Sequence, residues 1–152
     1  WRNVDLDAKI FRVIDTKNGE DHTLPLSDFL YDMLLERRMN IFNRYVFPGD
    51  TKEGYILLPQ KLMDRVARES GVSFTLHDLR RTFITIAEGL DIPAYALKRL
   101  LNHKMRNDVT AGYIITDVER LRIPMQKVAD YIKQIVGVKF SASVLPFQVK
   151  SA

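Results

Sequence analysis

The first quarter of the chain has the spacing of β-strands, in which successive side chains point to opposite faces. Ile10, Arg12 and Ile14 alternate with two apolar residues, and residues 22–26 form a second run of the same kind. Between the two runs lies Lys17-Asn18-Gly19. An Asn-Gly pair favours a tight turn because both residues tolerate a positive φ. The pattern therefore predicts an antiparallel hairpin whose returning strand is residues 22–26.

After residue 27 the apolar positions recur every three or four residues, which is the period of an α-helix. Ser27 is a suitable N-cap for the first of these helices. An irregular stretch over residues 40–58 follows, and a second helix then runs from Pro59 to about residue 69, ahead of Gly71. The apolar face of the first helix comprises Phe29, Leu30, Met33 and Leu34.

A third helix is predicted to begin at a capping box, in which Thr75 caps the helix and Asp78 reaches back to the cap. Pro93 opens a short helix that ends near Asn102, and Asn107 or Asp108 opens another. The residues that we expect the third helix to bury are Leu79, Phe83, Ile86 and Leu90.

The last helix is predicted to start at a second capping box, formed by Thr116 and Glu119, and to end at Gly137. No internal repeat is present. The chain is therefore expected to be α+β, mostly α, with a small antiparallel sheet followed by a helical bundle. The apolar seam of the last helix comprises Val118, Leu121, Met125, Val128, Ile132 and Ile135.

Composition narrows the class of protein. A chain of 152 residues is long enough to bury the core of one domain, and 46% hydrophobic with 28% charged residues is typical of globular proteins. No apolar run approaches the roughly 20 residues that span a bilayer. The absence of cysteine excludes disulfides, thiolate metal sites and cysteine nucleophiles, and it fits a reducing compartment.

The net charge of +4 is unevenly distributed. Residues 1–50 hold 7 basic and 9 acidic side chains, whereas residues 101–152 hold 8 basic and 4 acidic ones. A basic region of this kind indicates either a surface that binds a polyanion such as nucleic acid or an ordinary solvated surface.

Common catalytic motifs are missing from the sequence. There is no phosphate-binding G-x-x-x-x-G-K-[ST] loop, no G-x-G-x-x-G, no H-E-x-x-H and no G-x-S-x-G. The three histidines, His22, His77 and His103, do not have the spacing of zinc ligands, so no metal is expected.

The remaining candidates are basic and hydroxyl side chains in a fixed order. His77 and Arg80 are three residues apart on one predicted helix, about 60° apart around its axis and away from its apolar stripe. His103 follows the end of the next helix, and Tyr113 comes ten residues later. Each residue alone also has an ordinary structural explanation, as a core or surface side chain.

Taken together, these residues resemble the tyrosine recombinases, or phage integrases. The shared pattern is H-x-x-R at residues 77–80, then Leu101-Asn102-His103 at a helix end, then Tyr113. The opening Trp1-x-x-Val4-Asp5 and the hairpin over residues 16–27 resemble the start of the same catalytic domain. The resemblance covers roughly the first 136 residues.

The segment from His103 to Tyr113 is similar in particular to the integrases of bacterial prophages and genomic islands. The resemblance implies a site-specific recombinase that acts on double-stranded DNA without a cofactor. It also implies a homotetramer on DNA, in the cytoplasm of a bacterial cell and with a prophage origin.

The resemblance also implies a role for each site residue. Tyr113 attacks a DNA phosphodiester and holds the 3′ end as a phosphotyrosine. Arg80 binds the non-bridging oxygens of that phosphate, and His103 donates a hydrogen bond to it. His77 serves as general base or second donor, and Lys17 protonates the departing 5′ oxygen.

The domain boundaries follow from the same resemblance. Residues 1–137 are expected to be a catalytic domain without the amino-terminal part that carries the family's first arginine, and so an incomplete catalyst by themselves. Residues 138–152 are expected to be an apolar tail that covers a sheet edge or docks on a neighbouring protomer. In a DNA-free state the Tyr113 segment and the Lys17 hairpin are expected to stand away from the phosphate.

Two alternatives stay open at this level. A type IB topoisomerase shares the phosphotyrosine chemistry, and a non-catalytic helical module binds DNA without cutting it. All the recombinase assignments require His77, Arg80 and His103 to converge on one open basic cleft. Opposite placement of Arg80 and His103 would contradict them.

Overall fold

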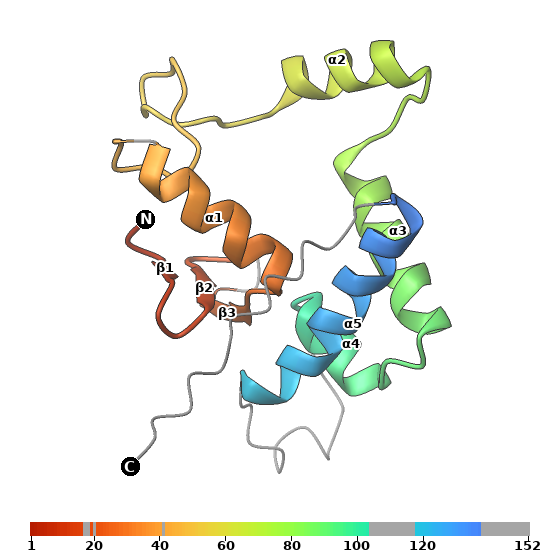
Figure 1. Ribbon diagram of the computed structural model, residues 1–152. Helices are drawn as coiled ribbons and strands as arrows, with labels where there is room; N and C mark the ends of the chain where they lie inside the picture. The colour runs from red at the N-terminus through yellow and green to blue at the C-terminus, as the bar shows by residue number, and fades with distance from the viewer. Residues whose placement is uncertain (17–18, 20, 41, 104–117, 138–152) are drawn as a thin grey trace, which may run out of the picture.

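The computed structural model describes residues 1–16, 19, 21–40, 42–103 and 118–137. A small sheet precedes five helices, so the predicted α+β, mostly α, class is confirmed (Figure 1). The elements are β1 (Val4–Asp5), β2 (Ile10–Val13), β3 (His22–Pro25), α1 (Asp28–Asn40), α2 (Gln60–Ser70), α3 (Leu76–Gly89), α4 (Ala94–Leu100) and α5 (Glu119–Ile135).

The sheet is antiparallel with the strand order β1-β2-β3. Val13 pairs with His22, which confirms the predicted hairpin. Its turn is closed by the Gly19 amide, which donates to the Thr16 carbonyl oxygen at 2.7 Å, and Gly19 has the positive φ of 76° that the sequence led us to expect. Sequence reasoning missed β1, because a strand of two residues has too few positions to show a period.

The capping box of α3 forms as predicted. The Asp78 amide donates to the Thr75 hydroxyl oxygen at 3.2 Å, and the Thr75 amide donates to the Asp78 carboxylate at 2.9 Å. These hydrogen bonds satisfy amide groups that have no partner within the helix. They fix the first turn of α3, which is the turn that carries His77.

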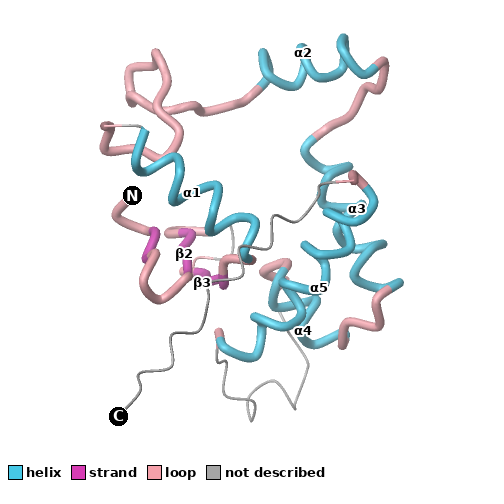
Figure 2. The backbone as a smooth tube through the Cα atoms, viewed as in Figure 1, coloured by secondary structure: helices cyan, strands magenta, loops and turns pink. Residues whose placement is uncertain are grey.

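α5 lies at the centre of the packed region and contacts α3, α4 and β3, as Figure 2 shows for the cluster of helices. Val128 is the most buried residue of its seam, with 1% of its surface exposed. The buried cluster brings one residue of the sheet together with residues of the three helices and the turns beside them. Its members are Leu24, Ala87, Ile92, Ala96, Leu97, Leu100, Leu101, Leu121 and Val128.

Part of the predicted core is exposed. On α1 Leu34 is buried, but Phe29 and Met33 are exposed. Leu79 is 53% exposed because α3 joins the core only from Phe83 onward, one turn later. Ile132 and Ile135 likewise lie beyond the part of α5 that its neighbours cover.

Several predictions fall outside the described residues. These are the helix at Asn107 or Asp108, the cap at Thr116 and the tail over residues 138–152. α5 begins at Glu119 with no side-chain cap bond at Val118. No helix in the described part of the chain is long and apolar enough to cross a membrane.

We expect Val128→Ala to lower the free energy of unfolding by about 2 kcal/mol, because it leaves a cavity that the packed helices cannot close. Ile135→Ala on the same helix is the matched control. Ile135 is 63% exposed, so its truncation should change the free energy by less than about 0.5 kcal/mol. Urea denaturation measures both, and equal losses would contradict the position of α5 in the core.

Candidate active site

The first turn of α3 presents His77 and holds Asp78 in the cap. Hydrogen bonds from Thr75 lower the pKa of Asp78, with a smaller contribution from the nearby Arg81 cation. Asp78 is therefore an ionised cap residue, as the sequence predicted. His77, at the second position of the helix, is exposed to solvent.

Arg80 lies one turn further along α3 and reaches the end of α4. Its Nη2 atom donates to the Leu101 carbonyl oxygen at 2.7 Å, and the side chain is partly buried. The adjacent Arg81 is different, since its side chain is 72% exposed and lies 3.7 Å from Asp78 in a surface ion pair. The hydrogen bond to Leu101 therefore fixes the position of the Arg80 side chain, whereas the Arg81 side chain lies on the surface.

The end of α4 has the geometry of a Schellman motif. The His103 amide donates to the Lys98 carbonyl oxygen at 2.9 Å, and the Asn102 amide donates to that of Arg99 at 3.1 Å. Asn102 takes the left-handed conformation that this motif requires, with φ 53°. The chain is thereby turned sharply after Leu101, and His103 is left exposed just beyond the helix.

The carbonyl group that accepts from Arg80 belongs to Leu101, two residues before His103. The Arg80 guanidinium therefore lies at the end of α4 that His103 follows, while the convergence of their side chains on one phosphate stays a prediction. His77 lies on the same helix as Arg80, three residues earlier. No hydrogen bond or ion pair within the described part of the chain joins His77 to the other two.

The two remaining predicted site residues, Lys17 and Tyr113, lie outside the described residues. The described part of the candidate site is therefore His77, Arg80 and His103. No cluster of three or more metal-ligating side chains occurs among the described residues.

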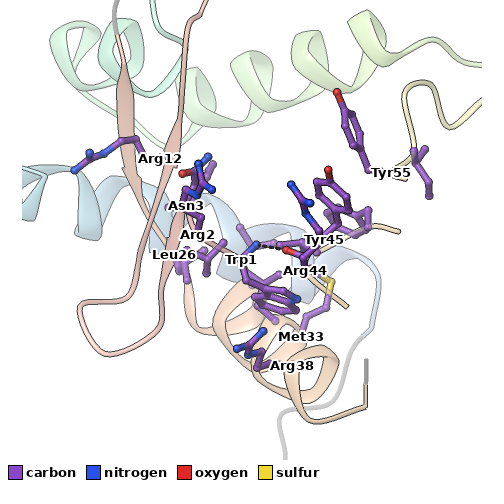
Figure 3. A pocket seen from close by; sticks show the side chains of 17 residues that line it. Trp1, Arg2, Asn3, Arg12, Leu26, Met33, Arg38, Arg44, Tyr45 and Tyr55 are labelled. Carbon is purple, nitrogen blue, oxygen red and sulfur yellow. Dashed lines mark hydrogen bonds between the residues drawn. The ribbon is translucent and has the colours of Figure 1, made fainter. Parts of the chain in front are cut away.

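A cavity of about 1000 Å³ lies elsewhere in the molecule, between the first residues, the sheet, α1 and the stretch after it (Figure 3). His77, Arg80 and His103 do not line it. It is rich in arginine and aromatic side chains, and the Arg38 guanidinium lies 5.1 Å from the centre of the Trp1 ring. The Trp1 amino group donates to the Arg44 carbonyl oxygen at 3.1 Å.

Sequence reasoning considered His22 only as a metal ligand and did not anticipate that its side chain is buried. Its side chain is 8% exposed, and its Nε2 atom has no hydrogen-bond partner among the described residues. Burial lowers the pKa of His22, and the Arg99 cation lowers it further. The signal that was available is its place at the start of the returning strand of the hairpin.

A family model described as the phage integrase family matches residues 1–120. The chain therefore belongs to the phage integrase family, and the resemblance seen in the sequence is confirmed. It is 25% identical over 150 residues to prophage integrase IntF of Escherichia coli K12, which covers 95% of this chain and 32% of the relative. It is 31% identical over 144 residues to tyrosine recombinase XerA of Thermococcus kodakarensis, covering 89% of this chain and 49% of the relative.

The chain spans about a third of the length of the first of these curated relatives and about half of the second. No solved structure matches it significantly. The two relatives are named as an integrase and a recombinase, which favours the recombinase hypothesis over a topoisomerase.

The turn at Asn102 gives a test of how His103 is positioned. We expect Asn102→Ala to lower the free energy of unfolding by about 1 kcal/mol more than Asn102→Gly does. Both substitutions remove the amide group, but only alanine has a Cβ that clashes at a positive φ. Denaturation of the two variants measures the difference, and equal stability would contradict the left-handed conformation at this position.

Proposed function

We propose that this chain is the catalytic domain of a site-specific DNA recombinase, which cuts and rejoins double-stranded DNA through a 3′-phosphotyrosine. The observation that carries the proposal is the hydrogen bond from Arg80 to the Leu101 carbonyl, in a chain of the phage integrase family. It brings the cation that such chemistry needs to the turn that carries His103.

Arg80 is suited to binding a phosphate in this position. A guanidinium has five N–H donors in a planar fork, and only one donor is needed for the Leu101 carbonyl. The others can bind the non-bridging oxygens and stabilise the charge of the transition state. In the proposal, exposed His103 donates to the same phosphate, and His77 is the general base or second donor.

The bond changes in the proposed reaction involve Tyr113 and Lys17. The Tyr113 phenol loses its proton to His77, and its oxygen attacks the phosphorus. The bond from phosphorus to the 5′ oxygen breaks, and Lys17 gives that oxygen a proton. Rejoining reverses these steps. It needs no nucleotide cofactor, because the phosphotyrosine retains the energy of the broken phosphodiester bond.

The organisation of the whole protein is also part of the proposal. Residues 1–137 form the catalytic domain, and residues 138–152 form a tail that docks on a neighbouring protomer of a tetramer assembled on DNA. The tail is apolar, with lysines as its only charged side chains, which supports docking on a protein surface. A bacterial cytoplasm and a prophage origin are supported by the named prophage relative.

We expect Tyr113→Phe in the intact protein to abolish covalent attachment to a nicked suicide DNA substrate, because it removes the attacking oxygen. DNA affinity should survive, since it depends mainly on Lys and Arg contacts to phosphates. Tyr131→Phe, at an exposed tyrosine of α5, is the control and should still form the adduct. A protein–DNA adduct with Tyr113→Phe would contradict the assignment, and no adduct with any variant or the wild type would favour the non-catalytic module.

Lys17→Ala should cleave ordinary DNA slowly and recover on DNA with sulfur in place of the scissile 5′ oxygen. A thiolate leaves without a proton, whereas an alkoxide needs one. Arg80→Ala should not recover, because its defect concerns the non-bridging oxygens. Single-turnover cleavage rates on both substrates measure the effect, and no recovery of Lys17→Ala would leave Lys17 with DNA binding alone.

A further inference from the structure

The cavity between the first residues, the sheet, α1 and the stretch after it gathers positive charge (Figure 3). Four arginines from different segments line it. They are Arg2 before β1, Arg12 in β2, Arg38 in α1 and Arg44 beyond α1. No aspartate or glutamate lines the cavity, although residues 1–50 hold more acidic than basic side chains. The fold therefore concentrates cations here, against the composition of the segment that supplies them.

These four guanidinium groups carry charge that the protein leaves uncompensated. All four arginines are exposed, and none forms an ion pair with a carboxylate of the described residues. Like charges around one cavity repel each other, and a bound anion relieves that repulsion. The planar fork of a guanidinium matches the oxygens of a phosphate. The charge pattern therefore indicates an anionic ligand, and a phosphate group suits it.

Aromatic side chains also line the cavity. The Arg38 guanidinium lies 5.1 Å from the centre of the Trp1 ring, and that of Arg44 lies 4.8 Å from the centre of the Tyr45 ring. The rings of Tyr45 and Tyr55 are 5.0 Å apart and tilted by 51°. Nucleic acid bases stack on aromatic rings and on guanidinium planes alike. The cavity wall thus has surfaces for a flat base beside the groups that suit a phosphate.

The size of the cavity favours a ligand with both parts. Its volume is about 1000 Å³, at the upper end of the range for small-molecule sites. A phosphate ion alone fills little of that space, whereas a nucleotide adds a sugar and a base. The Trp1 Nε1 atom is buried with no hydrogen-bond partner among the described residues. Unpaired buried donors are rare in native proteins, so this wall is not optimised for stability alone.

We propose that this cavity is a nucleotide-binding site, in which the arginines bind phosphate oxygens and the aromatic side chains stack on the base. His77, Arg80 and His103 do not line the cavity, so it is separate from the candidate cleavage site. The ligand is either a free nucleotide or an unpaired nucleotide of a DNA strand, since both present the same groups. Membership of the phage integrase family favours a nucleotide over other flat anions.

The test titrates the 152-residue chain with thymidine 5′-monophosphate, single-stranded oligothymidylate and inorganic phosphate. Trp1 is the only tryptophan of the chain and lines the cavity, so quenching of its fluorescence reports binding at this site. We expect the monophosphate to bind about 10-fold more tightly than inorganic phosphate, because stacking of the base adds to the ionic contacts. Equal affinity for the two, or no quenching by any of the three probes, would overturn the proposal.

Variants separate the cavity from general attraction to anions. Arg38→Gln and Arg44→Gln should each weaken binding of the monophosphate by about 10-fold, because each removes charge-assisted hydrogen bonds. Tyr55→Leu should weaken binding of the monophosphate by about 5-fold and leave that of inorganic phosphate unchanged. Arg68→Gln removes the same charge from exposed α2, outside the cavity, and should have no effect. Equal losses in Arg68→Gln and in the cavity variants would contradict a defined site.

The oligonucleotide distinguishes the two sources of the ligand. If oligothymidylate binds about 10-fold more tightly than the monophosphate, the site holds an unpaired strand. If the monophosphate binds as tightly, the site takes a free nucleotide. The duplex with oligoadenylate should quench Trp1 weakly, because its bases are already stacked and paired, and quenching equal to that of the single strand would overturn the proposal. None of these measurements involves DNA cleavage, so failure here leaves the proposed function standing.

Discussion

Burial of α5 against its neighbours is the constraint on which the other contacts depend. Val128 packs into the cluster shared by α3, α4 and β3, and the polar side of the same helix reaches back to the start of the chain. Arg122 donates to the Ala8 carbonyl oxygen at 2.8 Å, and Gln126 accepts from the Asp28 amide at 2.9 Å. One helix therefore holds the sheet and the beginning of α1 against the helices that carry the candidate site.

This packing explains how a helix as short as α4 keeps a fixed position. α4 has only seven residues, and an isolated helix of that length is not stable in water. Its position comes from burial of Leu97 and Leu100 and from partners for its terminal carbonyls. Because the partner of the Leu101 carbonyl is Arg80 of α3, the turn after Leu101 takes its place from the tertiary structure.

Features with a local cause were predictable from the sequence. The Thr75–Asp78 capping box and the hairpin with Gly19 at a positive φ follow from side chains a few residues apart. Burial was less predictable, since helical spacing shows which face is apolar and cannot show where a neighbour covers it, as Leu79 illustrates. The contact between Arg80 and Leu101 joins residues far apart in the chain, so spacing gave no sign of it.

The same limit applies to the candidate site as a whole. The residue types and their order indicated the family. A resemblance of this kind identifies candidate site residues but does not show where they lie in the fold. The structure then placed Arg80 and His103 at one end of α4. The burial of His22 became visible only in three dimensions, because the order of side chains does not show which strand positions other elements cover.

The anchored state of Arg80 has an energetic consequence for ligand capture. A long side chain that is free in solution loses about 0.5–1.5 kcal/mol of conformational entropy when a ligand immobilises it. In Arg80 much of that loss has already occurred during folding, through the bond to Leu101, whereas the neighbouring Arg81 remains a surface side chain. A lysine could not do the same, because its ammonium group lacks the planar fork that directs separate donors to two acceptors. Arg80 and Arg81 thus differ in how far their side chains are ordered before a ligand binds, and Arg80 can bind an oxyanion with little rearrangement.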